Sequence, residues 1–354
     1  MSLSRGHIPS LDGIRAVSIG IVFVAHCGFG QIVPGGFGLT IFFFLSGFLI
    51  TTLLYREWDG QAAIDLPGFY IRRVLRLGPP LMAVLVPGLL LVQVGLLQGN
   101  FHLPSLLSQL FFYFNYFSLY SPHVTSNVEG LAVLWSLSVE EHFYILWPAF
   151  FILLGLGRIG IRSIVSILVL VLVWRCVRFF VFGAAEGTIY ISTDTRIDSL
   201  LYGCLLAVLN WKGLSARIFP PPGQAWWVIG AALAVLLATF VIRDDSFRST
   251  LRYTLQGLAL MPLFHYAITM PDVPVFRPLN WPAVRLIGIL SYTIYLVHYV
   301  IIRGLEFNGI VAQGDPAMIP AAGVLSFLVA FAIYRYVEKP LHALRRTFRP
   351  TAPS

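Results

Sequence analysis

An arginine and a histidine in the first apolar segment have a spacing that places both on one side of a helix. Arg15 and His26 are eleven residues apart, with only apolar or small residues between them. Eleven α-helical steps of about 100° make three turns plus roughly 20°, so both side chains project from one stripe, roughly 16 Å apart along the axis. In hydrocarbon such groups are expected only where they face a protein interior or a wet cavity. This stripe is the predicted axis of an active site.

A cluster of arginines follows the second apolar segment. If Tyr70–Leu77 is helical, Arg72 and Arg76 are i,i+4 neighbours and can grip one anionic group together, with Arg73 beside them. Ordinary anchoring by the positive-inside rule is the competing interpretation. The presence of Arg15 on the same predicted side of the membrane favours an anion site.

Two adjacent carboxylates and a histidine lie in a later apolar segment. Glu140 and Glu141 point about 100° apart on a helix, so at most one of them faces the same cavity as His26. A neutral imidazole is suited to taking a proton from a hydroxyl group, and an adjacent carboxylate can orient it and stabilise the imidazolium. The pattern therefore favours a histidine base, with one of the two adjacent carboxylates able to support it.

Several other intramembrane polar residues have both a functional and a structural interpretation. Asp194 and Asp198 are i,i+4 and share a helix face, where they either act directly or form a helix N-cap with Arg196 in a local ion pair. Arg178 is expected to snorkel to the outer interface. His298 is expected to be a hydrogen-bonded structural histidine rather than a base.

The composition is that of a polytopic, all-α membrane protein. The 354 residues are 57% hydrophobic and only 11% charged, with mean hydropathy +0.80, whereas soluble domains carry about 25% charged residues. The net charge of +8 comes from cations at segment ends, which fits membrane orientation and not a nucleic-acid partner. Three scattered cysteines form neither a disulfide framework nor a metal pattern, so we predict no metal site.

The order of segments predicts a single domain over residues 1–354, with a membrane core of about 11–340 and a short basic tail at 341–354. Eleven apolar segments are present, and an odd number of crossings would separate the two basic ends. We therefore interpret the aromatic segment 104–120 as re-entrant or interfacial. About ten transmembrane helices remain, with both termini cytoplasmic. The spans are expected at 15–33, 37–55, 77–98, 131–154, 161–183, 193–211, 225–242, 252–270, 284–303 and 317–337.

At these residues the chain resembles acyltransferase family 3 of the membrane-bound O-acyltransferases. The matching pieces, in family order, are Leu11–Ala16 with the Arg-x10-His spacing, Phe42–Leu49, Arg72–Arg76, Trp135–Tyr144, Asp194–Leu201, Ser291–His298 and Glu338–Pro340. Each piece is weak by itself, but the ordered set is specific and runs from residue 11 to 340. Some members of the family carry an extracytoplasmic hydrolase-like domain; we expect none here and carry over no second catalytic step.

The resemblance implies transfer of an acyl group, commonly acetyl from acetyl-CoA, to a hydroxyl group of a carbohydrate or glycolipid-like acceptor. His26 is then the catalytic base. The donor phosphates are held by four arginines: Arg15, Arg72, Arg73 and Arg76. Three carboxylates orient the site or balance its charge: Glu140, Asp194 and Asp198. The aromatic residues of 111–120 are expected to stack on a sugar ring, and the protein is expected in the cytoplasmic (inner) membrane.

Three alternatives remain open. The acyl group can pass through a protein nucleophile, for which Cys27 is one option, although consecutive helix positions diverge from His26. The chain can instead be a proton-coupled transporter that uses its histidine and carboxylates as a relay, although no repeat symmetry is evident. A membrane scaffold leaves the intramembrane charges unexplained.

Overall fold

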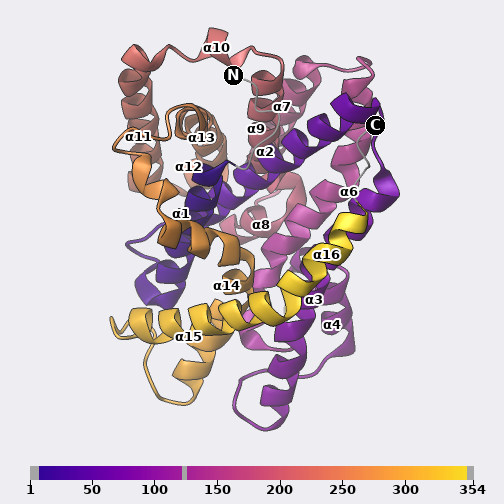
Figure 1. Cartoon of the computed structure of the whole chain (residues 1–354). Helices are drawn as coiled ribbons and strands as arrows, with labels where there is room; N and C mark the ends of the chain where they lie inside the picture. The colour runs from indigo at the N-terminus through magenta and orange to yellow at the C-terminus, as the bar shows by residue number, and fades with distance from the viewer. Residues whose placement is uncertain (1–7, 122–125, 349–354) are drawn as a thin grey trace. The chain divides into compact units, whose positions relative to one another are not determined.

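A computed structural model describes residues 8–121 and 126–348, and within them the chain is helical with no strand. This agrees with the all-α membrane fold predicted from composition. The α-helices are α1 (Pro9–Val24), α2 (Gly35–Gln61), α3 (Leu66–Gln93), α4 (Leu103–Leu110), α5 (Phe114–Tyr120), α6 (Trp135–Gly155), α7 (Ile161–Cys176), α8 (Glu186–Ile191), α9 (Thr193–Trp211), α10 (Ser215–Ile218), α11 (Ala225–Val241), α12 (Asp245–Ser249), α13 (Leu251–Thr269), α14 (Pro282–Phe307), α15 (Met318–Ile333) and α16 (Lys339–Thr347) (Figure 1).

Each of the ten predicted spans falls on a helix. Eight helical segments within the described residues are long and apolar enough to cross a membrane, and α9 and α13 are the two predicted spans outside that set. In α9 the polar residues Asp194, Arg196 and Asp198 lower the hydropathy, while most of the helix is buried. The protein is thus a multi-pass membrane protein, while the count of ten and the cytoplasmic termini stay predictions.

The aromatic segment 104–120 forms two short helices rather than one span. Helix α4 has 8 residues and α5 has 7, and the chain breaks between them at Phe112, whose φ is 57°. At about 1.5 Å per residue each helix is roughly 12 Å long or less, against about 30 Å of hydrocarbon. Neither helix can therefore cross a membrane by itself, as predicted for this segment.

The described residues form two compact units. Unit 1 is drawn from residues 8–15, Leu39–Ala63 and Val139–Arg285. Unit 2 is drawn from Ala16–Gly38 and from residues 64–121, 126–138 and 286–348. The sequence predicted a single domain, and the contacts within the chain group its residues into these two sets.

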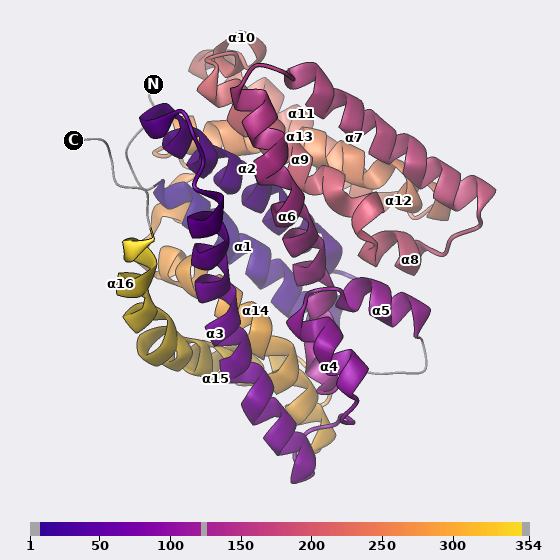
Figure 2. The ribbon, with the colours of Figure 1, turned by 90° about the vertical axis from the view of Figure 1, so that its right-hand side faces the viewer.

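In unit 1 the helices α7, α9, α11 and α13 pack side by side (Figures 1 and 2). Helix α9 also lies against α2 through two glycines. A Cβ at Gly47 would lie 2.0 Å from the Leu200 carbonyl oxygen, and one at Gly203 would lie 1.9 Å from that of Phe44. Small residues allow this close approach, which is how helices associate in lipid without a hydrophobic driving force.

In unit 2 the C-terminal helix α16 and the turn before it pack against α3 (Figure 1). Gly130 lies directly on α14, because a Cβ there would be 2.4 Å from the Cα of Val300. The hydroxyl group of Tyr295 on α14 donates to the Val133 carbonyl oxygen at 2.8 Å. These contacts fix the position of α14, which carries His298.

Within the described residues three α-helices end in a π-helical turn, and each turn carries a titratable residue that the sequence analysis considered. The turns are Ala25–Phe29 after α1, Val177–Val181 after α7 and Tyr334–Glu338 after α15. They hold His26, Arg178 and Glu338 respectively. Such turns occur frequently at functional sites, and the turn around His26 is in addition kinked at Gly28, whose φ of 106° is not helical.

Candidate active site

His26 lies in the π-turn after α1 in unit 2, and its ring is held by a second histidine. The Nδ1 atom of His26 is 2.8 Å from Nε2 of His298. The two rings are nearly parallel, with an interplanar angle of 7° and centroids 5.1 Å apart. The two nitrogens are only 2.8 Å apart while the ring centroids are 5.1 Å apart. This combination requires the rings to lie edge to edge in one plane and excludes face-to-face stacking. The hydrogen bond therefore follows the lone-pair direction, which is its favoured geometry.

His298 is completely buried in α14 and is itself anchored to the backbone. Its Nδ1 atom lies 2.7 Å from the carbonyl oxygen of Tyr295 and 3.2 Å from that of Ile294. The expectation of a hydrogen-bonded histidine is met. Its partner at Nε2, however, is the predicted catalytic base, 272 residues away in the chain.

The backbone of the His26 turn is clamped by the loop between α14 and α15. The side-chain amide of Gln313 donates to the His26 carbonyl oxygen at 2.7 Å, and the Gly314 N–H donates to that of Cys27 at 2.8 Å. Gly28 has φ of 106°, a value that favours glycine, and a Cβ there would lie 2.3 Å from the Gly314 nitrogen. Backbone contacts and a glycine conformation thus determine how the turn presents His26.

Apolar and aromatic residues surround this turn. The Tyr299 ring lies 4.7 Å from that of His26, and Phe23 lies beside His298. Cys27, considered as a nucleophile, is fully buried in a cluster with Ile302 and neighbouring apolar residues. A fully buried thiol in apolar surroundings is of the inert structural kind, which agrees with the low rank given to Cys27.

The arginine cluster begins the long helix α3 in unit 2. Asp65 caps this helix by accepting from the Gly68 N–H at 3.0 Å, and residues 70–77 are helical as the paired-arginine prediction requires. Arg72 ion-pairs with Asp65 at 3.8 Å and donates to the Phe348 carbonyl oxygen. Arg76, one turn later, is exposed. The i,i+4 arrangement therefore exists, with Arg72 already partly engaged.

The remaining predicted site residues lie in unit 1. Arg15 ion-pairs with Asp12 of its own helix at 3.5 Å. Glu140 accepts a hydrogen bond from the Ser46 hydroxyl group at 3.1 Å and from that of Tyr144 at 3.5 Å. The bond between Ser46 and Glu140 links α2 to α6 within unit 1.

Asp194 and Asp198 share a helix face, as predicted, but have different partners. Asp194 accepts from the indole N–H of Trp174 at 2.6 Å and ion-pairs with Arg178 at 3.6 Å. Asp198 pairs with Arg175 at 2.6 Å, and both side chains are fully buried. The N-cap interpretation is wrong, because α9 is capped at Ser192 without a side-chain bond. Both carboxylates ion-pair with residues of the α7 segment.

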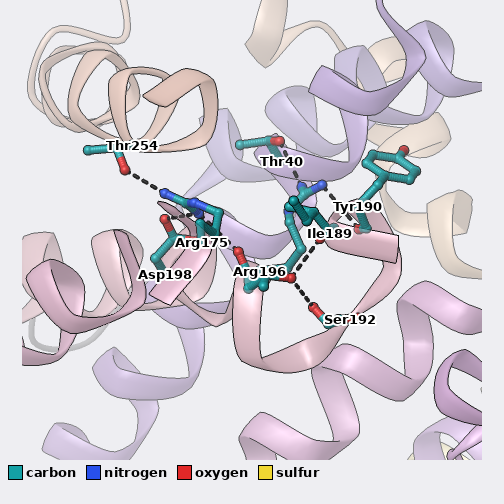
Figure 3. A network of polar contacts seen from close by, with 9 residues as sticks. Thr40, Arg175, Ile189, Tyr190, Ser192, Arg196, Asp198 and Thr254 are labelled. Carbon is teal, nitrogen blue, oxygen red and sulfur yellow. Dashed lines mark hydrogen bonds and ion pairs between the residues drawn. The ribbon is translucent and has the colours of Figure 1, made fainter. Parts of the chain in front are cut away.

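Two fully buried arginines form a polar network inside unit 1 (Figure 3). Arg175 donates to Asp198, to the Thr195 carbonyl oxygen at 3.0 Å and to the Thr254 hydroxyl group at 2.6 Å. Arg196 donates to the Thr40 hydroxyl group at 3.1 Å. Its guanidinium carbon is also 3.9 Å from the centre of the Tyr253 ring, a cation–π contact that offsets part of the desolvation cost.

No role was predicted for Arg175 from its place in the sequence. Its position one helical turn before Arg178 was a weak signal, because only the packing of α7 on α9 places it against Asp198. No group of three or more potential metal ligands occurs within residues 8–121 and 126–348. The predicted site residues thus fall into two sets. Unit 2 contains His26, Arg72, Arg73 and Arg76, and unit 1 contains Arg15, Glu140, Asp194 and Asp198.

Comparison with known proteins supports the resemblance drawn from the motifs. A family described as an acyltransferase domain matches residues 8–335, which include His26 and His298. The chain belongs to this family. Its members are acyltransferases by description, so an acyl donor fits the chain better than a transported solute does.

Two curated relatives cover most of the chain. It is 29% identical over 364 residues to the peptidoglycan O-acetyltransferase OatA of Listeria monocytogenes, covering 96% of this chain and 56% of that protein. It is 31% identical over 366 residues to the O-acetyltransferase OatA of Staphylococcus aureus, covering 96% of this chain and 58% of that protein. The chain thus spans a little over half of the length of these relatives. No solved structure matches it.

Proposed function

We propose that this chain is a membrane O-acetyltransferase that transfers an acetyl group from acetyl-CoA to a hydroxyl group of a glycan. The family match gives the class of reaction, and the names of the relatives give a glycan acceptor, for which peptidoglycan is the first choice. Cytoplasmic entry of the donor follows from the basic residues expected on that side. A proton-coupled transporter is not favoured, because the family and both relatives are named for acyl transfer.

The observation that carries this proposal is that only one of the two ring nitrogens of His26 is hydrogen-bonded. A general base needs a ring nitrogen that is not already used in a hydrogen bond. Nδ1 of His26 is bonded to His298, and Nε2 has no hydrogen-bond partner among residues 8–121 and 126–348. The side chain is also half-buried rather than sealed inside the protein, so an acceptor hydroxyl group can approach it.

The reaction needs one proton transfer and one acyl transfer. The acceptor O–H bond breaks as His26 takes the proton, and the oxygen attacks the thioester carbonyl carbon. The C–S bond then breaks, and His26 returns the proton to the leaving thiolate, which gives the ester and free CoA. The α3 arginines Arg72, Arg73 and Arg76 suit the donor phosphates, because guanidinium groups bind phosphate in bidentate fashion. Roles for Arg15, Glu140, Asp194 and Asp198 in this reaction remain predictions.

Steady-state kinetics of the purified protein test the proposal. With radiolabelled acetyl-CoA and a peptidoglycan oligosaccharide, His26→Ala should lower kcat by about 10²–10⁴-fold while binding of the donor is retained. His265→Ala is a matched control, because His265 is a half-buried histidine of unit 1 stacked on Phe219. Near-normal turnover by His26→Ala would exclude His26 as the base. Donor hydrolysis without acetylation of any glycan would reject the acceptor class.

A further inference from the structure

The hydrogen bonds around His298 determine which of its nitrogens carries a proton. Nδ1 faces two backbone carbonyl oxygens, those of Tyr295 at 2.7 Å and Ile294 at 3.2 Å. A carbonyl oxygen can only accept, so Nδ1 of His298 must be the N–H donor. In a neutral imidazole the other nitrogen, Nε2, then has a lone pair and acts as an acceptor.

The protonation of His298 also determines the protonation of His26, because the two rings share a hydrogen bond. Nε2 of His298 accepts, so the bond of 2.8 Å requires Nδ1 of His26 to be the N–H donor. The neutral ring of His26 then carries its lone pair at Nε2, the nitrogen without a hydrogen-bond partner among the described residues. We propose that His298 is a positioning residue that fixes the tautomer and plane of His26, so that Nε2 is the basic atom.

An imidazole here takes the orienting role that a carboxylate was expected to play. The proposal rests on the proposed function, because it assumes that His26 is the base. It adds that a completely buried, neutral histidine, His298, supports this base. The backbone carbonyl oxygens that face Nδ1 of His298 fix its tautomer. The coplanar, edge-to-edge rings favour this role, because the His26 ring cannot rotate without losing the bond to His298.

The proton taken from the acceptor stays on His26. When Nε2 gains the proton, His26 becomes an imidazolium whose Nδ1–H still donates to His298. Moving that Nδ1 proton onward would place a cation on the completely buried His298, where the lost hydration costs more than hydrogen bonds to two carbonyl groups recover. His26 is half-buried and keeps part of its hydration. His298 therefore orients the base and accepts the hydrogen bond from its Nδ1–H. The proton that Nε2 of His26 took from the acceptor hydroxyl group is then given to the thiolate.

Two substitutions separate orientation from simple packing. His298→Leu removes the acceptor and should lower kcat by about 100-fold, with little change in the KM for acetyl-CoA. His298→Gln places a side-chain oxygen where Nε2 accepts and should recover kcat to within roughly tenfold of the natural protein. His265→Leu, the same change on the half-buried histidine of unit 1, is the control and should retain kcat. Equal losses in the Leu and Gln variants would overturn the positioning role.

Nitrogen NMR of the ¹⁵N-histidine-labelled protein provides a readout that packing alone does not move. In the natural protein at alkaline pH, His26 should show a protonated Nδ1 and a bare Nε2. An Nε2–H tautomer of His26 in the natural protein would overturn the proposal. Because this measurement needs no variant, it remains a test even if His298→Leu does not fold. Kinetics separate the two proposals: near-normal turnover by His26→Ala rejects the base itself, whereas inactive His26→Ala with fully active His298→Leu rejects only the role of His298.

Discussion

Removing the negative charge of Asp198 should destabilise unit 1 through its ion pair with Arg175. The two side chains are fully buried, with Nη1 of Arg175 2.6 Å from Oδ2 of Asp198. Asp198→Asn preserves the shape of the side chain and one neutral acceptor, so the main change is the loss of charge. The guanidinium group then remains in the interior without a counter-charge.

The expected loss in the free energy of unfolding depends on the hydrogen-bond partners that Arg175 keeps in Asp198→Asn. Breaking a buried ion pair by removing one partner typically costs about 3–5 kcal/mol, because the other charge is left uncompensated. Arg175 still donates to the Thr195 carbonyl oxygen and the Thr254 hydroxyl group, and the Tyr253 ring lies 5.4 Å away. These neutral partners place the loss at the lower end of that range, at about 3 kcal/mol in the free energy of unfolding.

The free energy of unfolding can be measured by titrating mixed detergent micelles with dodecyl sulfate. Adding Arg175→Met to Asp198→Asn should recover stability to within about 1 kcal/mol of the natural protein, because no buried charge remains. Asp194→Asn, on the same helix face but partly exposed, is the control and should cost about 0–1 kcal/mol.

Two results would refute this reasoning. A loss below 1 kcal/mol in Asp198→Asn would mean that the buried charge is compensated in another way. If the double variant Asp198→Asn/Arg175→Met were as unstable as Asp198→Asn, the loss of stability would come from altered packing and not from an unpaired charge. Turnover measured in parallel decides the predicted catalytic role of Asp198: unchanged stability with abolished turnover would favour chemistry over structure.

Four further results are expected. Gly28→Ala should cost about 1–3 kcal/mol in the same titration, because φ is 106° and a Cβ would lie 2.3 Å from the Gly314 nitrogen, whereas Gly20→Ala meets nothing within 4 Å and should be neutral. Gly203→Ala should cost about 1–3 kcal/mol by separating α2 from α9, and unchanged stability would contradict that close approach. Arg72→Ala should raise the KM for acetyl-CoA about tenfold with kcat nearly unchanged; a fall in kcat alone would exclude simple donor binding. Arg158→Cys, in a protein whose natural cysteines are replaced, should react with an impermeant thiol reagent only from the cytoplasmic side; labelling from outside would restore 104–120 as a span.

Local composition and helical spacing predict the elements of this fold well. A lipid-facing chain must satisfy its backbone hydrogen bonds internally, so apolar segments of about 20 residues become helices without help from distant residues. The prediction that 104–120 is re-entrant or interfacial came from the even number of crossings that two basic ends require, whereas the break at Phe112 was found only in the structure. The i,i+4 relations of Arg72 with Arg76 and of Asp194 with Asp198 also follow from helical geometry alone.

The sequence by itself determined an all-α membrane protein, its family and the residue types able to do acyl-transfer chemistry. Only the tertiary structure decided how those residues are engaged. His298 bonds His26 from 272 residues away, and Asp198 is paired by Arg175 on another helix. The physical reason is that spacing fixes directions only within one helix. Partners across helices depend on close packing at glycines such as Gly203 and on kinked turns such as Ala25–Phe29, which no local pattern reveals.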